Sequence, residues 1–193
     1  MHPYSLFALL ILSLLSFQNN AKTFDKQTSL GVGNTVLYNG KSYPLVGVGL
    51  TVGHKMPCVD LVNEDGKRVN TLNNDGLKTI YFIIPSVDEP LSTEHIIKMS
   101  QTNFVKPIRL LFLSSDSVHT LKRFKFFHQL HKMTFLTDSR THGFGLRTGT
   151  LIFDQGELTR AIIVTDENNQ VLSIQANADL LELPSIMEAL TLI

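Results

Sequence analysis

Hydrophobic and polar residues follow one another along most of the chain in a pattern typical of an α/β domain. Residues 35–45 predict a β-hairpin, because Asn39-Gly40 supplies the positive φ angles of a tight turn. Residues 59–72 predict a second hairpin. Residues 79–84 and 108–113 are apolar on both faces, as expected of buried central strands.

Helical patterns follow these strands. Pro90 suits the first turn of a helix that extends to about residue 101, and Asp88 is positioned to cap it. Residues 118–130 predict a second helix, because apolar side chains recur on one face. Pro184 opens a third helix near the end of the chain.

The remaining apolar runs are short. They predict strands at 133–136, 151–153, 161–164 and 171–174, the last two joined as a hairpin. No repeat or low-complexity linker divides the sequence. We therefore expect one domain over residues 22–193, with a mixed β-sheet flanked by helices and an N-terminal β-hairpin.

The first residues depart from this pattern. Leu6–Phe17 is almost continuously apolar, which matches the length of a signal-peptide core and is too short to span a bilayer. Ala21 is a candidate cleavage point. We predict a signal peptide at residues 1–21, a periplasmic or secreted location, and no stable membrane anchor after signal removal. The alternatives are an uncleaved anchor or a misassigned start.

Composition narrows the choice of function. The chain has 193 residues, with 17 Lys and Arg against 17 Asp and Glu, so its net charge is zero. A neutral chain has no overall field that attracts nucleic acid, and we expect no nucleic-acid partner. Cys58 is the only cysteine, which excludes an intramolecular disulfide and a cysteine-based zinc site.

One segment between the first buried strand and the first helix carries candidate chemistry. It reads Pro85-Ser86-Val87-Asp88-Glu89-Pro90-Leu91-Ser92. This segment resembles the active-site motif Pro-Ser-x-Asp-Thr-x-x-Cys of the thiol peroxidase branch of the peroxiredoxins, the atypical 2-Cys enzymes. Glu89 stands where the motif has threonine, and Ser92 stands where it has the peroxidatic cysteine.

The resemblance extends from about residue 33 to the C-terminus. Ser114-Ser115-Asp116, followed by Arg123-Phe124, is similar to the family's Ser-x-Asp…Arg-Phe-Cys segment, with Lys125 at the resolving cysteine. Arg160 opens a strand similar to the one whose arginine faces the peroxidatic thiolate. The resemblance implies a thioredoxin-like α/β fold, a homodimer, and a thioredoxin-dependent peroxidase that needs no metal or other cofactor.

The substitutions remove the chemistry that the resemblance would imply. Peroxide reduction needs a thiolate, and a serine hydroxyl has no comparable two-electron oxidation. Lys125 cannot resolve a sulfenic acid. We therefore interpret the chain as a catalytically inactive homologue that binds a protein partner or has a structural role. The interpretation treats a set of positions as vestigial: Pro85, Glu89, Ser92 and Arg160 in the active site, and Lys125 at the resolving position.

The substitutions also predict a contact. With Ser92 neutral, the arginine of the active site would be left without a counter-ion. We predict that Glu89, at the start of the same helix, forms an ion pair with Arg160.

Two further hypotheses concern other residues. Cys58 could support residual thiol-dependent peroxidase activity, although its place in the family pattern suggests a buried residue that replaces a core phenylalanine. His128 and His131, with His119 or His142, could make the protein an exported metal-binding module, but solvated surface histidines fit this spacing better.

A hydrolase triad is the last alternative. Ser92 and His95 are three residues apart on the predicted helix, and Glu89 or Asp88 could complete the set. No oxyanion-hole motif accompanies them, so we do not favour this hypothesis.

Overall fold

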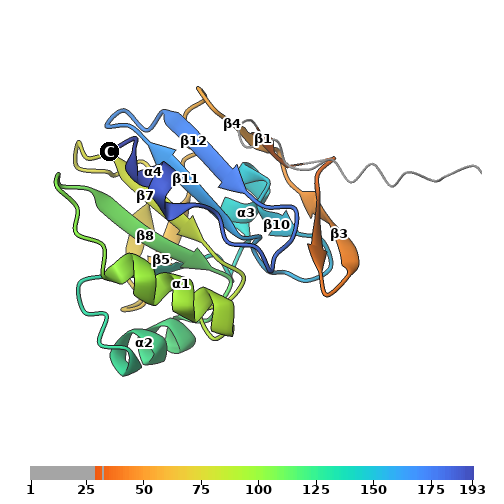
Figure 1. Ribbon diagram of the computed structural model, residues 1–193, viewed down its shortest axis with the longest axis horizontal. Coiled ribbons are helices and arrows are strands. Elements are labelled where there is room, and N and C mark those ends of the chain that lie inside the picture. Colours follow the sequence, from red (N-terminus) through yellow and green to blue (C-terminus); the bar gives the residue numbers. More distant parts are fainter. Residues whose placement is uncertain (1–28, 32) are drawn as a thin grey trace, which may run out of the picture.

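Seven strands form the central sheet of the computed structural model, which describes residues 29–31 and 33–193 (Figure 1). The predicted signal peptide lies outside the described residues. The strand order is β12 (Val171–Ala176), β11 (Ala161–Thr165), β7 (Thr79–Ile83), β8 (Arg109–Ser114), β9 (Thr134–Thr137), β5 (Asp60–Asn63) and β6 (Arg68–Asn70). Only the β7–β8 and β8–β9 pairs are parallel within this sheet. The predicted mixed sheet is therefore confirmed.

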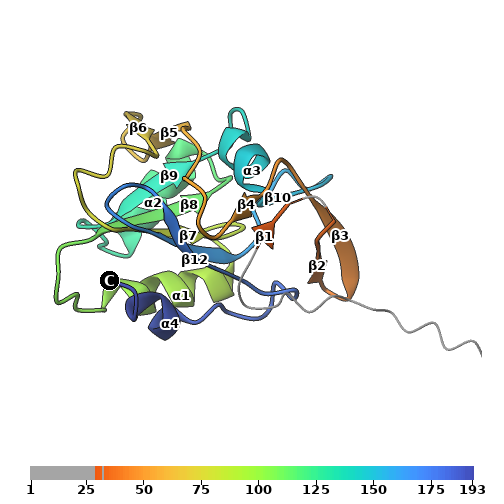
Figure 2. The same ribbon diagram turned by 90° about the horizontal axis from the view of Figure 1, so that it is seen from above.

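The predicted N-terminal hairpin is formed by β2 (Thr35–Tyr38) and β3 (Lys41–Val46). Its turn residues Asn39 and Gly40 have φ angles of 50° and 75°, the left-handed geometry expected of Asn-Gly. β10 (Leu151–Ile152) pairs with β3, and β1 (Ser29–Leu30) pairs with β4 (Leu50–Thr51). Figure 2 shows β2 and β3 at one end of the molecule, beside the central sheet.

Four helices flank the sheet in the described part of the chain: α1 (Pro90–Ser100), α2 (Val118–Phe127), α3 (Gly143–Thr148) and α4 (Ile186–Leu190). Ile96 of α1, Phe124 of α2 and Ala189 of α4 belong to one buried cluster. Phe144 of α3 belongs to a second buried cluster, with residues of the N-terminal hairpin. The sheet is thus covered on both faces, and no helix among the described residues is long and apolar enough to cross a membrane.

β7 shows why the sequence pattern identified the core. All five of its residues are buried. Ile80 and Phe82 join the cluster beneath α1, α2 and α4, whereas Tyr81 and Ile83 join the cluster on the opposite face. Successive side chains of a strand point to opposite faces, so a strand that is covered on both sides must be apolar throughout.

Two details of the predicted helices are wrong. Asp88 does not cap α1, because the N-cap is Glu89 and Asp88 pairs with Arg123 instead. α2 ends at Phe127 rather than near residue 130, since Gln129 takes a left-handed conformation with φ of 56°.

The helix α3 was not predicted from the sequence. Its six residues include Gly143 and Gly145, and glycine disfavours a helix interior. Asp138 compensates, because its carboxylate accepts hydrogen bonds from the backbone N–H groups of Phe144 at 3.0 Å and Gly145 at 2.8 Å. The pattern of apolar residues along the sequence does not predict this contact.

Candidate functional site

The start of α1 lies beside the first residue of β11. Ile83, at the end of β7, is the register partner of Ala161. Arg160 immediately precedes Ala161, so it is placed next to the segment that leads from β7 into α1. There it meets Glu89 and Ser92, and we call these three residues the α1 site.

One carboxylate oxygen joins the three residues of the α1 site. Arg160 Nη2 donates to Glu89 Oε2 at 2.5 Å, and Ser92 Oγ donates to the same oxygen at 2.5 Å. Arg160 Nη1 donates to Ser92 Oγ at 3.1 Å. The predicted ion pair between Glu89 and Arg160 is therefore confirmed, and Ser92 is hydrogen-bonded to both of its members.

The α1 site is largely closed to solvent. Ser92 is fully buried, Arg160 is 1% exposed, and the side chain of Glu89 is 18% exposed. A buried guanidinium is strongly unfavourable unless its charge is balanced and its N–H groups are bonded. Glu89 balances the charge, and the carbonyl of Leu180 accepts from Arg160 Nε at 3.0 Å. As a result, all three side chains of the α1 site have polar partners inside the protein.

Asp116, just after β8, holds the loop that precedes α1. Its carboxylate accepts from Ser86 Oγ at 2.8 Å, from the backbone N–H of Val87 at 2.8 Å and from Ser114 Oγ at 2.7 Å. Pro85 is buried in the same loop. Ser86 and Asp116 both belong to segments that resemble family motifs, and their hydrogen bonds give them a structural role, which is to fix the loop that leads into α1.

Lys125 occupies α2 and pairs with Glu64, in the turn between β5 and β6. Glu64 is 4% exposed, and its second carboxylate oxygen accepts from the backbone N–H of Phe135 at 3.0 Å. Lys125 therefore neutralises a buried acid and attaches α2 to the edge of the sheet. Sequence reasoning missed Glu64, because an acid in a Glu-Asp-Gly turn is normally exposed.

His95 is buried one turn after Ser92, but the predicted alternative of a hydrolase triad is not formed. Ser92 Oγ donates to Glu89, and the ring of His95 packs edge-on against Phe82 with 4.5 Å between centroids. Its Nδ1 is buried and has no hydrogen-bond partner among the described residues. Burial, followed by the charges of Arg160 and Lys98, lowers the pKa of His95 to about 4.

The expectation of a buried Cys58 is wrong, since this residue is exposed. Val59 and Leu61 point into the core, so the two-residue period of extended chain turns Cys58 and Asp60 outward. Cys58 Sγ accepts a hydrogen bond from Asn70 Nδ2 at 3.3 Å. The protein's one thiol is therefore on the surface and belongs to a different part of the fold from the α1 site.

Metal ligands do not gather in the described part of the chain. Residues 29–31 and 33–193 contain no group of three or more His, Cys, Asp or Glu side chains that could hold a metal ion. The ring of His128 instead packs against Phe124 and Phe127, with centroid distances of 4.5 and 5.1 Å.

Comparison with known proteins gives a consistent assignment. The family described as Redoxin matches residues 51–190. The thiol peroxidase of Clostridium acetobutylicum is 28% identical over 137 residues, which cover 70% of this chain and 83% of that protein. The thiol peroxidase of Helicobacter pylori is 27% identical over 156 residues, which cover 78% and 93%.

Solved structures share the fold. A peroxiredoxin-like protein from Aquifex aeolicus has a TM-score of 0.77 at 23% identity, over 83% of this chain and 96% of that one. The thiol peroxidase from Chromobacterium violaceum has a TM-score of 0.71 at 22% identity, over 81% and 93%. These likenesses establish the thioredoxin-like fold, and the match over most of the sequence establishes the family. The chain belongs to the redoxin family, in its thioredoxin-fold thiol peroxidase branch.

Proposed function

We propose that this protein is a thiol peroxidase homologue without peroxidase activity, which acts by binding a protein partner or by a structural role. One observation carries the proposal. Ser92 Oγ lies at the start of α1, where the family motif has its cysteine, and its hydrogen bonds run to Glu89 and Arg160. A hydroxyl cannot replace the thiolate that reduces peroxide. On this proposal Pro85, Glu89, Ser92 and Arg160 are vestigial active-site positions.

The position of Lys125 supports the same proposal. An amine cannot condense with a sulfenic acid to form a disulfide, and here the amine is paired with the buried Glu64. Both positions that would exchange electrons in a 2-Cys enzyme are thus occupied by groups held in ion-pair networks. On this proposal, Lys125 is the vestigial resolving position.

Steady-state peroxide turnover tests the loss of activity. The purified protein is mixed with hydrogen peroxide and a thioredoxin–thioredoxin reductase system, and consumption of the reductant is followed. We expect no turnover above the rate without protein. Turnover that saturates with peroxide would contradict the proposal.

A second candidate function rests on Cys58. Its exposed thiol is accessible to peroxide or to a partner thiol, which a buried cysteine would not be. In this alternative the protein is a thiol-dependent antioxidant that acts through Cys58. Turnover that disappears in the variant Cys58→Ser would establish it.

Export is a further part of the proposal. The apolar run Leu6–Phe17 supports a signal peptide over residues 1–21 and a periplasmic or secreted location. Mass spectrometry of the protein from the periplasmic fraction should give an N-terminus near residue 22. A full-length N-terminus in the cytoplasmic fraction would contradict export.

A further inference from the structure

Three neighbouring residues at the start of β7 carry buried polar atoms that have no hydrogen-bond partner. Thr79 is the register partner of Thr165 in β11 on one side and of Arg109 in β8 on the other. Thr79 Oγ1, Thr165 Oγ1 and Arg109 Nη1 are all buried and unpartnered among the described residues. Folded proteins satisfy nearly all of their buried polar groups, so three such atoms in one place indicate a binding site. We call these three residues the β7 row.

The side chains of the β7 row point to the same face of the sheet. Register partners in adjacent strands lie side by side, and neighbouring strands are about 4.8 Å apart. Tyr81, two residues after Thr79, belongs to the buried cluster that also contains Phe144. The row therefore faces away from α1, α2 and α4. It lies at the opposite end of β7 from the α1 site.

The β7 row combines buried hydroxyls with a positive charge. Thr79 and Thr165 are 0% exposed, and Arg109 is half-buried. Burial lowers the pKa of Arg109, and no acid of the described residues forms an ion pair with it. Asp75 interacts with Arg109 electrostatically, but it is exposed and lies beyond ion-pair distance. The row thus offers three hydrogen-bond donors and one charge that is not balanced locally.

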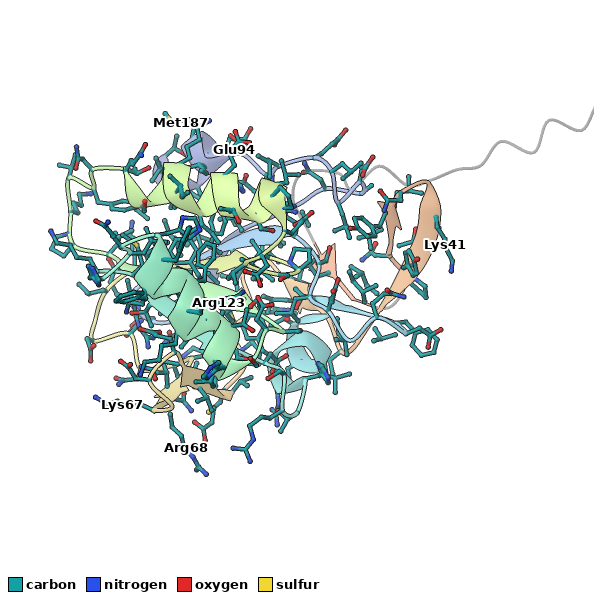
Figure 3. All side chains as sticks on the ribbon, turned by 90° about the horizontal axis from the view of Figure 1, so that it is seen from below. Lys41, Lys67, Arg68, Glu94, Arg123 and Met187 are labelled. Atoms are coloured by element: carbon teal, nitrogen blue, oxygen red, sulfur yellow. The ribbon has the colours of Figure 1, made fainter. Side chains whose placement is uncertain are left out.

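An arginine without an ion pair is ordinary where water surrounds it. Arg68 also has no ion pair among the described residues, and Figure 3 shows it pointing away from the sheet into solvent. Arg109 differs, because its Nη1 is buried beside two buried hydroxyls. An uncompensated charge is costly there. An anion bound by the row would accept hydrogen bonds from the three donors and would balance the charge.

We propose that the β7 row binds a small monovalent inorganic anion of the size and chemistry of chloride. Each threonine hydroxyl turns its hydrogen towards the anion, and Arg109 Nη1 supplies an N–H and the counter-charge. A water molecule would satisfy the hydroxyls but would leave the charge of Arg109 unbalanced. Sulfate carries two charges, of which the row balances only one. The site goes beyond the proposed function and does not depend on it.

Anomalous diffraction from crystals of the protein soaked in sodium bromide tests the position of the anion. Bromide has the charge of chloride and scatters X-rays anomalously. We expect an anomalous peak within hydrogen-bonding reach of Thr79 Oγ1, Thr165 Oγ1 and Arg109 Nη1. A water molecule at this place, or bromide peaks confined to other parts of the molecule, would overturn the proposal.

Unfolding in urea tests whether the anion binds in solution. The midpoint is measured in potassium chloride and in potassium gluconate at the same ionic strength, because an anion that binds only the folded chain stabilises it. We expect the midpoint of the parent to rise with chloride. Thr165→Val should weaken the apparent affinity for chloride by about tenfold or more. Thr165→Ser keeps the hydroxyl and should respond like the parent.

Two matched variants separate the site from general effects of salt. Thr159→Val removes another buried hydroxyl that lacks a partner, just before the start of β11, whereas Thr165 is the last residue of that strand. Arg68→Met removes an arginine that has no ion pair. Both variants should keep the response of the parent to chloride, and Arg109→Met should lose it. Equal responses of Thr165→Val and Thr159→Val, or equal midpoints of the parent in chloride and gluconate, would contradict the proposal.

Discussion

Arg160 determines the electrostatics of the α1 site. It is the largest fully buried side chain of the described residues, and its charge needs a partner inside the protein. In the family motif the partner is a thiolate, which Ser92 cannot provide. Glu89, the N-cap of α1, lies three residues before Ser92 and places its carboxylate oxygen 2.5 Å from Arg160 Nη2. The two departures from the motif thus compensate each other: one removes a negative charge and the other restores it.

Glu89→Gln should therefore destabilise the protein. It leaves the buried guanidinium of Arg160 without a counter-charge, and the partial exposure of Glu89 moderates the effect. We expect a loss of about 2–4 kcal/mol in the free energy of unfolding, measured by urea denaturation. Asp88→Asn, which breaks the exposed pair with Arg123, is the control and should cost less than about 1 kcal/mol. Equal effects of the two variants would show that the α1 site is not held by this charge.

A cysteine at position 92 should reveal the influence of Glu89 on a thiol. In a Cys58→Ser background, Ser92→Cys places the thiol next to the Glu89 carboxylate, whose negative charge raises the thiol pKa. Adding Glu89→Thr removes that charge, while Arg160 remains to favour the thiolate. The ultraviolet absorbance of the thiolate should therefore appear at lower pH in the variant with both substitutions. Identical titration curves would contradict this account of the site.

His95 should make the protein less stable in acid. Its pKa is lowered from 6.5 to about 4 in the folded protein, so between these values the unfolded chain binds a proton that the folded chain does not. The stability that the neutral His95 contributes to the folded protein is fully present above pH 6.5 and is lost as the pH falls towards 4. His95→Leu should remove up to about 1.4 kcal/mol per pH unit from the slope of stability against pH in this window. Parallel curves for parent and variant would show that His95 does not contribute.

The helix α2 is joined to its surroundings at three points. Phe124 packs in the core, Lys125 pairs with the buried Glu64, and Arg123 pairs with Asp88 at the start of α1. The first two contacts are largely shielded from water, whereas the third is exposed. We therefore expect the contact between Lys125 and the sheet edge to matter more for the position of α2 than the contact with α1.

Lys125→Met tests this difference. It keeps the length of the side chain but leaves Glu64 buried and unpaired, which should cost about 2–4 kcal/mol in the free energy of unfolding. Adding Glu64→Gln should recover part of the loss, because it removes the unpaired charge. Lys122→Met is the control. Lys122 Nζ lies 3.7 Å from Asp65 Oδ1, and both side chains are more than half exposed. The control should therefore lower the free energy of unfolding by at most about 1 kcal/mol. A similar loss in Lys122→Met would mean that burial of Glu64 is not the cause.

Across the whole molecule, the sequence predicted those features that depend on local pattern. The sequence of β7, which is apolar on both faces, identified the core, and Asn39-Gly40 identified the first hairpin. The spacing of the motif that begins at Pro85 located the α1 site. The pair formed by Glu89 and Arg160 was also predictable, because a buried charge requires a counter-charge wherever the fold places it.

The features that the sequence did not predict depend on contacts between distant segments. Val59 and Leu61 face the core, so the alternation of side chains along the extended chain leaves Cys58 exposed. Glu64 is buried in contact with two distant segments, since it pairs with Lys125 of α2 and accepts from the backbone N–H of Phe135. α3 contains two glycines and forms with the help of Asp138, whose burial raises its pKa even though backbone N–H groups bond to it. None of these contacts leaves a periodic signal in the residues concerned.

The reaction of the protein with one equivalent of hydrogen peroxide, followed by stopped flow without any reductant, distinguishes an inactive homologue from a peroxidase. It needs no partner protein, so a negative result cannot be attributed to a missing reductant. We expect the parent to consume peroxide no faster than free cysteine at the same pH, and we expect Cys58→Ser to abolish even this reaction. Consumption orders of magnitude faster than free cysteine, or stoichiometric consumption that persists in Cys58→Ser, would contradict it.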